Sequence, residues 1–335
     1  MTAGTPALPQ NSDSRADRPY WEVYNSLNSD LSDAPVYVIV IDTLDNKWIG
    51  TNDGGLLKLD ANKKWTVYKK SDTDIPSNIV NDLAVDTEGN IWVATPRGLA
   101  ILENGVSGVN TSWGVFKTDE AELSQSYISS VAIDVNSDIW IGTWGSLVRI
   151  SNDPPTSISA KVSARYHEVF DTSNSELPHP MVNSLAIDSK GNKWVGTYGG
   201  GLARYDGSEW VIYNIRNSGL PDDYVLALGI DDQDNIWIGT QVGGLAKFDG
   251  ENWEIYKMSN SKIPEDFVYC VTVGKDGGVW IGNYYGGVAE FKDNKWSNYD
   301  LFNMGLPYYE ISTIQIDERG NEWIGTNGGI VVFLQ

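Results

Sequence analysis

The chain has 335 residues and a formal net charge of −21, which disfavours binding to the phosphate backbone of nucleic acids. Its single cysteine, Cys270, excludes an intramolecular disulfide and a Cys-rich zinc site, and two histidines leave little room for a histidine-based metal centre. No apolar run approaches the roughly 18 residues of a membrane span, so we expect no membrane insertion.

One short phrase containing a tryptophan recurs seven times along the chain, in forms close to Asn-Lys-Trp-Ile-Gly-Thr at residues 46–51. An aspartate stands six residues before every one of these tryptophans except the sixth, where Gly274 takes its place. A period of about 43 residues indicates a repeat architecture. The tryptophans, spaced by 43 to 54 residues, are Trp48, Trp92, Trp140, Trp194, Trp237, Trp280 and Trp323.

The first element expected along the chain lies at residues 19–25. It carries the aromatic pair Trp21 and Tyr24, and later repeats carry similar pairs. The first member of each pair stands 21 residues before the next aspartate position, and Trp21 obeys this rule with Asp42. We therefore expect residues 19–25 to be a strand of the repeat. Residues 1–18 are rich in Pro, Ser, Asp and Ala, which favours a disordered leader or linker.

Each repeat contains four short β-type runs, which we name A to D in chain order. Run A is exemplified by residues 182–188, run B by 235–240, run C by 244–249 and run D by 252–256. A tight turn rich in Gly and Asn joins runs A and B and supplies the positive φ of a hairpin. Small residues near the end of run A suit the crowded axis of a ring, so we expect run A to be innermost and the aromatic run D to be outermost.

Seven repeats of four antiparallel strands predict an all-β fold, a seven-bladed β-propeller. Only 12 residues follow Trp323, so the last repeat lacks its own run D. Residues 19–25 are expected to supply that strand, which closes the ring, hides the sheet edges and couples the two termini. The predicted organisation is therefore a leader or linker at 1–18 and a single propeller domain at 19–335.

The repeat unit Asp-x-x-Gly-Asn-x-Trp-Ile-Gly-Thr-x-x-Gly-Gly-Leu resembles the two-component regulator propeller repeat. It is best preserved at residues 188–202 and 317–330, and the Leu-Pro pairs at 220–221 and 306–307 fit the same family. The resemblance covers about residues 18–335. It implies an extracellular or periplasmic sensor propeller of a bacterium, in a family often linked to polysaccharide use. The family's large sensors carry further propellers and signalling regions, so a free-standing propeller or part of a longer protein is expected here.

Aromatic and small polar residues are expected to gather on one face of the ring. In propellers the D–A and B–C loops surround the channel mouth on one face, which we call the top face. Aromatic rings stack on the C–H faces of sugars while amides and hydroxyls bond sugar hydroxyls, so this mouth suits an oligosaccharide or another small ligand. Trp144 is the strongest candidate because it is the one tryptophan outside the repeated positions. The predicted ligand-binding residues are Trp144, Tyr198, Tyr284, Tyr285, Tyr37, Tyr269, Asn81, Asn183, Tyr224 and Tyr308.

Two other interpretations of the surface stay open. The top-face aromatic residues also suit packing between blades, or the anchoring of a protein or peptide partner. The C–D loops of the second and third repeats, at residues 103–112 and 152–163, are longer than the others. They suit a docking surface for a protein partner or a second copy in a cell-surface or secreted assembly, or simply the loop variation that surfaces tolerate.

Catalytic motifs are absent from the sequence, which favours a protein without enzymatic activity. The remaining enzymatic hypothesis is a polysaccharide lyase or hydrolase, with His179 as the general base and Tyr198 as the acid of a lyase. The Asp-x-x-Gly-Asn turns lack the dense ligand spacing of calcium loops, so we expect neither a metal nor a cofactor. Instead, their aspartates are expected to accept backbone hydrogen bonds within the turn. Cys270, in run A, is expected to be buried and inert.

Overall fold

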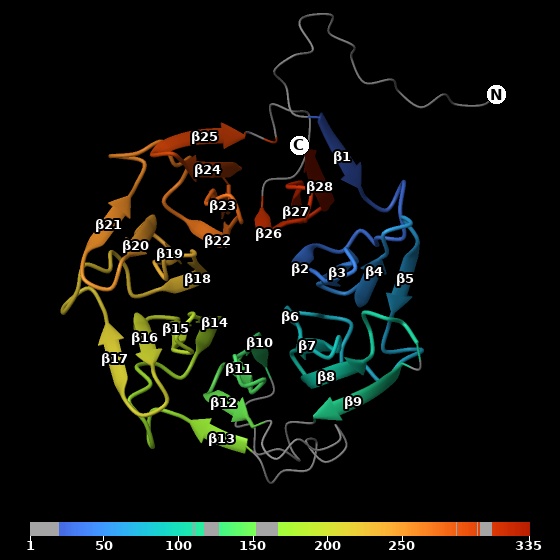
Figure 1. Ribbon diagram of the computed structural model, residues 1–335, viewed down its shortest axis with the longest axis horizontal. Coiled ribbons are helices and arrows are strands. Elements are labelled where there is room, and N and C mark those ends of the chain that lie inside the picture. The colour runs from blue at the N-terminus through green and yellow to red at the C-terminus, as the bar shows by residue number, and fades with distance from the viewer. Residues whose placement is uncertain are drawn as a thin grey trace, which may run out of the picture.

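Seven four-stranded sheets surround a central axis in the computed structural model, which describes residues 20–109, 111–116, 127–151, 167–285, 287–299, 301 and 310–335 (Figure 1). Each sheet is one blade, and its strands pair in the order A, B, C, D. The predicted seven-bladed β-propeller is therefore confirmed. Residues 1–18, predicted to be a leader or linker, lie outside the described residues.

The two inner strands of each blade carry the repeat phrase and the residues before it. Strand A lies next to the axis in Figure 1, as its small residues predicted. In blades 1 to 7 strand A is β2 (Val36–Ile41), β6 (Asp82–Val85), β10 (Ile128–Ile133), β14 (Val182–Ile187), β18 (Val225–Ile230), β22 (Val268–Val273) and β26 (Ile311–Ile316). Strand B is β3 (Lys47–Thr51), β7 (Ile91–Thr95), β11 (Ile139–Thr143), β15 (Lys193–Thr197), β19 (Ile236–Thr240), β23 (Val279–Asn283) and β27 (Glu322–Thr326).

The two outer strands of each blade carry apolar residues in strand C and the aromatic pair in strand D. Strand C is β4 (Leu56–Leu59), β8 (Gly98–Glu103), β12 (Leu147–Ile150), β16 (Leu202–Tyr205), β20 (Leu245–Phe248), β24 (Val288–Lys292) and β28 (Gly329–Leu334). Strand D is β5 (Trp65–Tyr68), β9 (Ser112–Phe116), β13 (His167–Phe170), β17 (Trp210–Tyr213), β21 (Trp253–Tyr256), β25 (Lys295–Tyr299) and β1 (Tyr20–Tyr24).

The ring is closed by strand β1, which completes the blade made by the C-terminus. It pairs antiparallel with β28, from Tyr20 opposite Leu334 to Tyr24 opposite Ile330. The ring of Tyr24 stacks on Trp323 of its own blade, with centroids 5.9 Å apart. The closure predicted from the repeat arithmetic is therefore confirmed.

The tryptophans of strand B lie buried between the blades. Trp194, for example, is 4% exposed, and its ring stacks on Tyr213 of strand D with centroids 5.9 Å apart. The glycine of the repeat phrase has a packing role. A Cβ atom at Gly196 would lie 2.6 Å from Cγ1 of Val225 in the next blade, so glycine permits the inner strands to approach closely. Cys270 is buried, as predicted.

The aspartate six residues before the tryptophan ties the A–B turn to the core. Asp188 Oδ1 accepts hydrogen bonds from the backbone amides of Lys190 and Asn192, at 3.0 and 2.9 Å. Its Oδ2 accepts from Asn192 Nδ2 at 2.7 Å and from Trp194 Nε1 at 3.0 Å. The backbone bonds confirm the prediction, whereas the bond to the indole was not foreseen. In five other blades the repeat tryptophan donates the same hydrogen bond from its Nε1 atom. The acceptors are Asp42, Asp86, Asp134, Asp231 and Asp317.

A buried glutamate at the start of β27 makes the stability of the ring depend on pH. Glu322 is 4% exposed, and its two carboxylate oxygens accept hydrogen bonds from Gln335 Nε2 at 2.9 and 3.2 Å. Burial, with a smaller contribution from the charges of Glu290 and Asp276, raises the pKa of Glu322 to about 7, while the bond from Gln335 acts in the opposite direction. The folded state therefore holds this proton more tightly than the unfolded chain does.

We expect the Glu322→Gln substitution to stabilise the protein more at high pH than at low pH. Because the folded pKa lies above the ordinary value, wild type loses stability as the pH rises towards 7 and levels off above it. The gain from the substitution should grow by about 2 kcal/mol between pH 5.5 and pH 8. Urea denaturation at both pH values measures it. Glu318→Gln, which removes an exposed partner of Lys275, is the control and should show no such growth.

Candidate ligand-binding site

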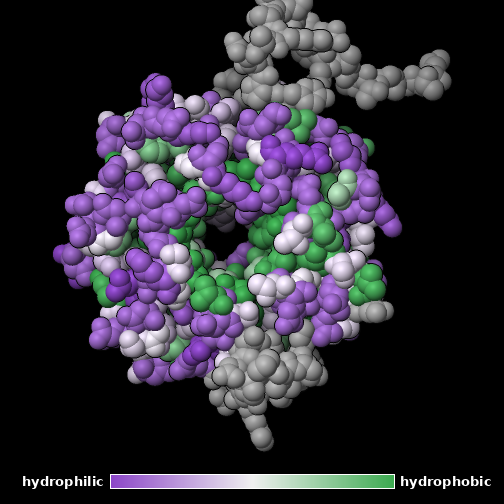
Figure 2. Space-filling model, viewed as in Figure 1, coloured by the Kyte–Doolittle hydropathy of each residue, from purple (hydrophilic) through white to green (hydrophobic). Residues whose placement is uncertain are grey.

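A cavity of about 630 Å³ lies on the axis of the ring, where Figure 2 shows a central opening. Strands A of all seven blades form its wall, and loops of the top face contribute to its rim. Figure 2 shows hydrophobic surface along part of the opening and mostly hydrophilic surface elsewhere on the face in view. The aromatic and polar residues that line the cavity include Tyr37, Asn81, Asp82, Tyr127, Trp144, Asn183, Tyr198, Gln241, Phe267 and Tyr269.

Six of the ten predicted site residues line this one cavity. They come from blades 1, 2, 3, 4 and 6, so residues far apart in the sequence converge on the axis. Tyr308 lies outside the described residues. The six are Tyr37, Asn81, Trp144, Asn183, Tyr198 and Tyr269.

Three further predicted residues stand beside the lining residues rather than among them. Tyr224 meets Tyr198 edge to face, with ring centroids 4.8 Å apart. Tyr284 lies 6.2 Å from Tyr269, and Tyr285 lies 4.5 Å from Tyr284, again measured between ring centroids. Tyr285 is 69% exposed. These three rings extend the aromatic surface outward from the cavity.

Trp144 presents a wide aromatic surface at the mouth. Its ring stacks on Tyr127 with centroids 4.0 Å apart and an interplanar angle of 25°. Its backbone amide donates to the Tyr127 carbonyl at 3.2 Å, which fixes the B–C loop of blade 3 to the preceding D–A loop. Trp144 nevertheless stays 44% exposed. Tyr127 therefore supports the indole from one side, and the exposed part of the indole is open to a ligand. Tyr127 was not among the predicted site residues, although it lies in a D–A loop as Tyr224 and Tyr308 do.

The two predicted asparagines join neighbouring blades at the cavity wall. Asn81 Nδ2 donates to the Ile128 carbonyl at 2.6 Å, and Asn183 Nδ2 donates to the Val225 carbonyl at 3.1 Å. Both acceptors belong to strand A of the next blade. The amide nitrogens are therefore committed to the ring, and what these side chains can offer a ligand is chiefly the amide oxygen.

The charge of the cavity is acidic. Among the described residues that line it there is no Lys, Arg or His, and the one carboxyl group is that of Asp82. Asp82 Oδ2 accepts from the Val131 amide at 2.8 Å and Oδ1 from the Leu83 amide at 2.9 Å. Burial raises the pKa of Asp82 to about 7. Asp82 was not among the ten predicted residues, although it is the one acidic residue among the equivalent positions Val38, Asp82, Ser130, Ser184, Ala227, Cys270 and Thr313.

Three tyrosines at the mouth, Tyr37, Tyr269 and Tyr284, keep their protons at neutral pH. Burial raises the pKa of Tyr37 and of Tyr269. A hydrogen bond to the Glu310 carboxylate, together with its charge, raises the pKa of Tyr284 to about 12. Protonated phenols donate hydrogen bonds and present uncharged rings. The mouth therefore combines hydroxyl donors, amide acceptors and aromatic faces, the groups that recognise polyhydroxylated rings.

The enzymatic hypothesis gains no support from the position of His179. Its Nδ1 accepts a hydrogen bond from the Met181 amide at 3.1 Å, and the residue is not among those that line the cavity. Within the described residues, no group of three His, Cys, Asp or Glu side chains could hold a metal ion. The same part of the chain contains no helix long and apolar enough to cross a membrane.

The long loops predicted as a possible partner surface are only partly described. Residues 152–163 lie outside the described residues, as does residue 110 in the loop of blade 2. In that loop Val106 is buried at 8% exposure, whereas Val109 is 64% exposed. Docking or self-association through these loops stays a prediction.

The fold defines a seven-bladed β-propeller assembled from one kind of repeat. The family model of the two component regulator propeller matches two stretches of the chain, residues 74–97 and 219–241. Both matches run from a D–A loop through strand B. No curated protein matches the sequence significantly.

Three solved structures illustrate what shares this fold. An extracellular domain assigned to a hybrid two component system of B. thetaiotaomicron is 23% identical with a TM-score of 0.78, covering 95% of this chain and 41% of that one. Virginiamycin B lyase from Staphylococcus aureus is 14% identical with a TM-score of 0.71, and the match covers 95% of this chain and 100% of the lyase. YCF48 bound to D1 peptide is 13% identical with a TM-score of 0.68, and the match covers 96% of this chain and 98% of YCF48. The chain thus spans about two fifths of the extracellular domain that it matches.

Proposed function

We propose that this chain is a non-catalytic, extracytoplasmic sensor-type propeller that binds an uncharged carbohydrate in the cavity of its top face. The observation that carries the proposal is the convergence of six predicted residues on one cavity of about 630 Å³. The volume falls in the range of small-molecule sites. The likeness to an extracellular sensor domain supports the location and the sensor role.

The chemistry of the mouth favours a neutral sugar over an acidic one. Trp144 and Tyr127 supply a stacked aromatic platform, and Asn81 and Asn183 supply amide oxygens around it. Asp82 lies in the wall, and no basic residue among the described lining residues would neutralise a uronate or a sulfate. An anionic ligand would therefore be desolvated next to a carboxyl group without compensation.

A thermal-shift screen against neutral oligosaccharides tests this function. A ligand that binds only the folded ring raises its melting temperature in a dose-dependent way. We expect Trp144→Ala to weaken the interaction by about tenfold, because a stacked aromatic anchor is lost. Val242→Ala, at an exposed position of another B–C loop, is the control and should bind as wild type does.

The competing function is recognition of a protein segment by the same aromatic mouth. The peptide-bound YCF48 structure shows that a propeller of this fold can hold a peptide. A folded sample that shows no shift with any neutral glycan, and whose Trp144→Ala variant loses a protein partner in pull-down, would replace the carbohydrate proposal with this one.

A further inference from the structure

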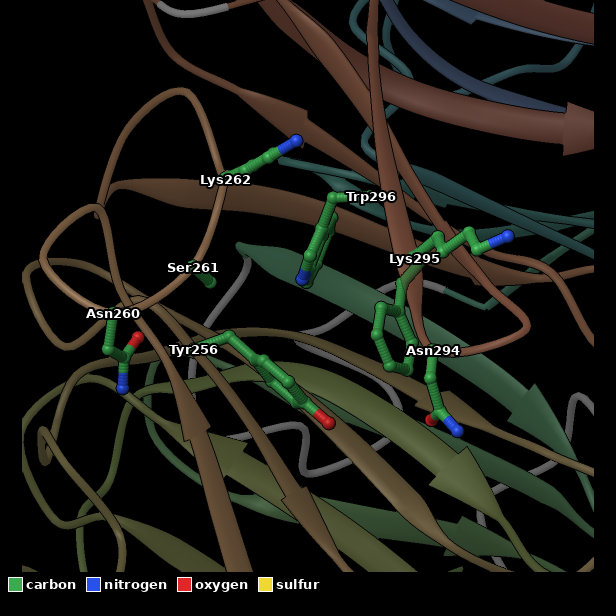
Figure 3. A pocket seen from close by; sticks show the side chains of 8 residues that line it. Tyr256, Asn260, Ser261, Lys262, Asn294, Lys295 and Trp296 are labelled. Carbon is green, nitrogen blue, oxygen red and sulfur yellow. The ribbon is translucent and has the colours of Figure 1, made fainter.

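A second hollow lies away from the axis, at the outer rim between blades 5 and 6. It encloses about 560 Å³, and Figure 3 shows the side chains that line it. The rings of Tyr256 and Trp296 meet edge to face with centroids 5.6 Å apart. In Figure 3 the side chains of Lys262 and Lys295 lie on opposite sides of Trp296. We call this hollow the rim groove.

The C–D turn beside the rim groove departs from the repeat. In blade 5 the residue after strand C is Asp249, which caps the loop by accepting from the Glu251 and Asn252 amides. In blade 6 the equivalent residue is Lys292, which cannot accept hydrogen bonds. The turn there instead places two consecutive residues, Asp293 and Asn294, at positive φ of 51° and 59°.

The tryptophan that follows this turn packs differently from its counterparts. Trp253 stacks on Phe248 at 4.5 Å and 22°, and the equivalent pair in blade 4, Tyr205 and Trp210, has almost the same geometry at 4.7 Å and 23°. Trp296 instead stands 5.0 Å from Phe291 at an angle of 42°. The altered turn therefore accompanies a tryptophan ring that is tilted relative to its strand C partner instead of stacked on it.

The loop on the other side of the rim groove departs from the repeat as well. At the junction of blades 4 and 5, Trp253 lies directly on Gly219, where an added Cβ atom would come within 2.5 Å of the indole. At the junction of blades 5 and 6 this position is Lys262, the one basic residue at a position that otherwise holds Gly, Asp or Glu. Its carbonyl accepts a hydrogen bond from Asn298 Nδ2 at 2.7 Å, which fixes the loop to strand β25. The space that the Trp253 indole fills at the junction of blades 4 and 5 is open at the junction of blades 5 and 6, where the rim groove lies.

The two lysines give the rim groove a positive charge in a strongly acidic protein. Among the described residues, neither Lys262 Nζ nor Lys295 Nζ has a carboxylate within ion-pair distance. Two acidic residues adjoin the groove: Glu254, which accepts a hydrogen bond from the Tyr256 hydroxyl at 2.7 Å, and Asp293 of the adjoining C–D turn. Figure 3 shows the indole nitrogen of Trp296 directed towards the side where Tyr256 and Ser261 lie. The groove thus combines an aromatic surface, an indole N–H donor and two ammonium groups.

We propose that the rim groove is a second binding site, which takes a pyranose ring carrying a carboxylate, as in a uronate-containing glycan. Trp296 and Tyr256 contact the ring, the indole N–H and the Asn294 amide bond its hydroxyls, and Lys262 and Lys295 pair with the carboxylate. Such a ligand does not fit the axial cavity, where Asp82 lies in the wall without a basic neighbour among the lining residues. The two sites therefore differ in the charge that they accept.

Fluorescence anisotropy with an end-labelled oligogalacturonide hexamer tests the proposal, in buffer containing EDTA so that no divalent cation bridges carboxylates. The fully methyl-esterified hexamer is the matched neutral probe, and hexaglutamate is the matched acidic peptide. We expect the acidic hexamer to bind saturably, and at least tenfold more tightly than either control. Binding should weaken as salt is raised, because the pairing charges are exposed to solvent.

Five variants assign the binding to the rim groove. Lys262→Gly, which restores the sequence of the neighbouring junction, and Lys295→Gln should each weaken binding by about two- to fivefold. Glu254→Gln should strengthen it because a repelling charge is removed. Trp296→Ala should weaken it about tenfold, whereas Trp253→Ala, the same strand position one blade earlier, should not affect it. Melting curves verify that each variant folds. If a tryptophan variant does not fold, the lysine variants alone show whether the ligand binds in the rim groove.

Three results would overturn the proposal. The first is the absence of saturable binding of the acidic hexamer by folded wild type. The second is equal binding of the methyl ester, or affinity unchanged in both lysine variants, since either removes the role of the carboxylate. The third is equal or tighter binding of hexaglutamate, which would make the occupant an acidic peptide. None of these results bears on neutral sugars in the axial cavity.

Discussion

Removal of strand β1 is expected to be the most damaging change that this propeller can undergo. A chain without residues 1–24 keeps three strands of blade 7 and exposes the edge of β28 along five residue pairs. It also loses Tyr24, whose ring lies 5.9 Å from both Trp323 of blade 7 and Trp65 of blade 1. Burial of several aromatic and aliphatic side chains is lost, so we expect destabilisation of roughly 5 kcal/mol.

The melting temperature of this truncated chain should fall by about 10 °C or more. The uncovered edge of β28 should also promote self-association, which size-exclusion chromatography detects. A chain that lacks only residues 1–19 is the control, and it should have the same melting temperature as the full-length protein. Equal melting temperatures for the two truncated chains would show that β1 does not hold the ring closed.

The Asp188→Ala substitution is expected to have the second largest effect. The carboxylate is 5% exposed and accepts four hydrogen bonds, two from backbone amides and two from Asn192 and Trp194 side chains. Alanine leaves the buried indole donor of Trp194 without a partner, and an unsatisfied buried group costs about 1–3 kcal/mol. We expect a total loss of about 3 kcal/mol in chemical denaturation. Asparagine should not rescue it, because its amide nitrogen would face other donors.

A matched control separates this buried cap from an exposed one. Asp206 also accepts two backbone amides, those of Ser208 and Glu209, but lies in an exposed C–D loop. Asp206→Ala should cost about 1 kcal/mol or less. Blade 6 carries Gly274 in place of the aspartate and still forms its four strands, so the Asp188 variant should fold. An equal loss for both substitutions would contradict the role assigned to the indole bond.

The architecture could be predicted from the sequence because the repeat fixes both period and register. The tryptophan of strand B marks each blade, and the distance from Trp323 to the end of the chain leaves room for only part of the last one. Ring closure by β1 followed from that arithmetic. The side-chain positions at the axis did not follow, since they depend on how neighbouring blades meet. Asn81 and Asn183 were predicted to serve a ligand, and the structure shows that their amide nitrogens bond the next blade.

The rim groove illustrates a different limit of sequence analysis. Lys262 and Lys292 each break the repeat, and an alignment of the seven repeats shows both departures. What the alignment does not show is that both lie beside one tryptophan. The D–A loop before blade 6 and the C–D turn of blade 6 meet only when two blades pack together. Departures from a repeat therefore indicate a site most clearly after the ring is assembled.

The closure of the ring also determines how the propeller responds to mechanical force. Tyr20 at the start of β1 lies opposite Leu334 at the end of β28, so both chain ends leave the ring at the same point. Force that separates the two ends loads the hydrogen bonds of this pair one after another rather than together. We therefore expect the strand to peel from its neighbour at low force, so that blade 7 opens before the other six blades, each of which is made from one continuous segment.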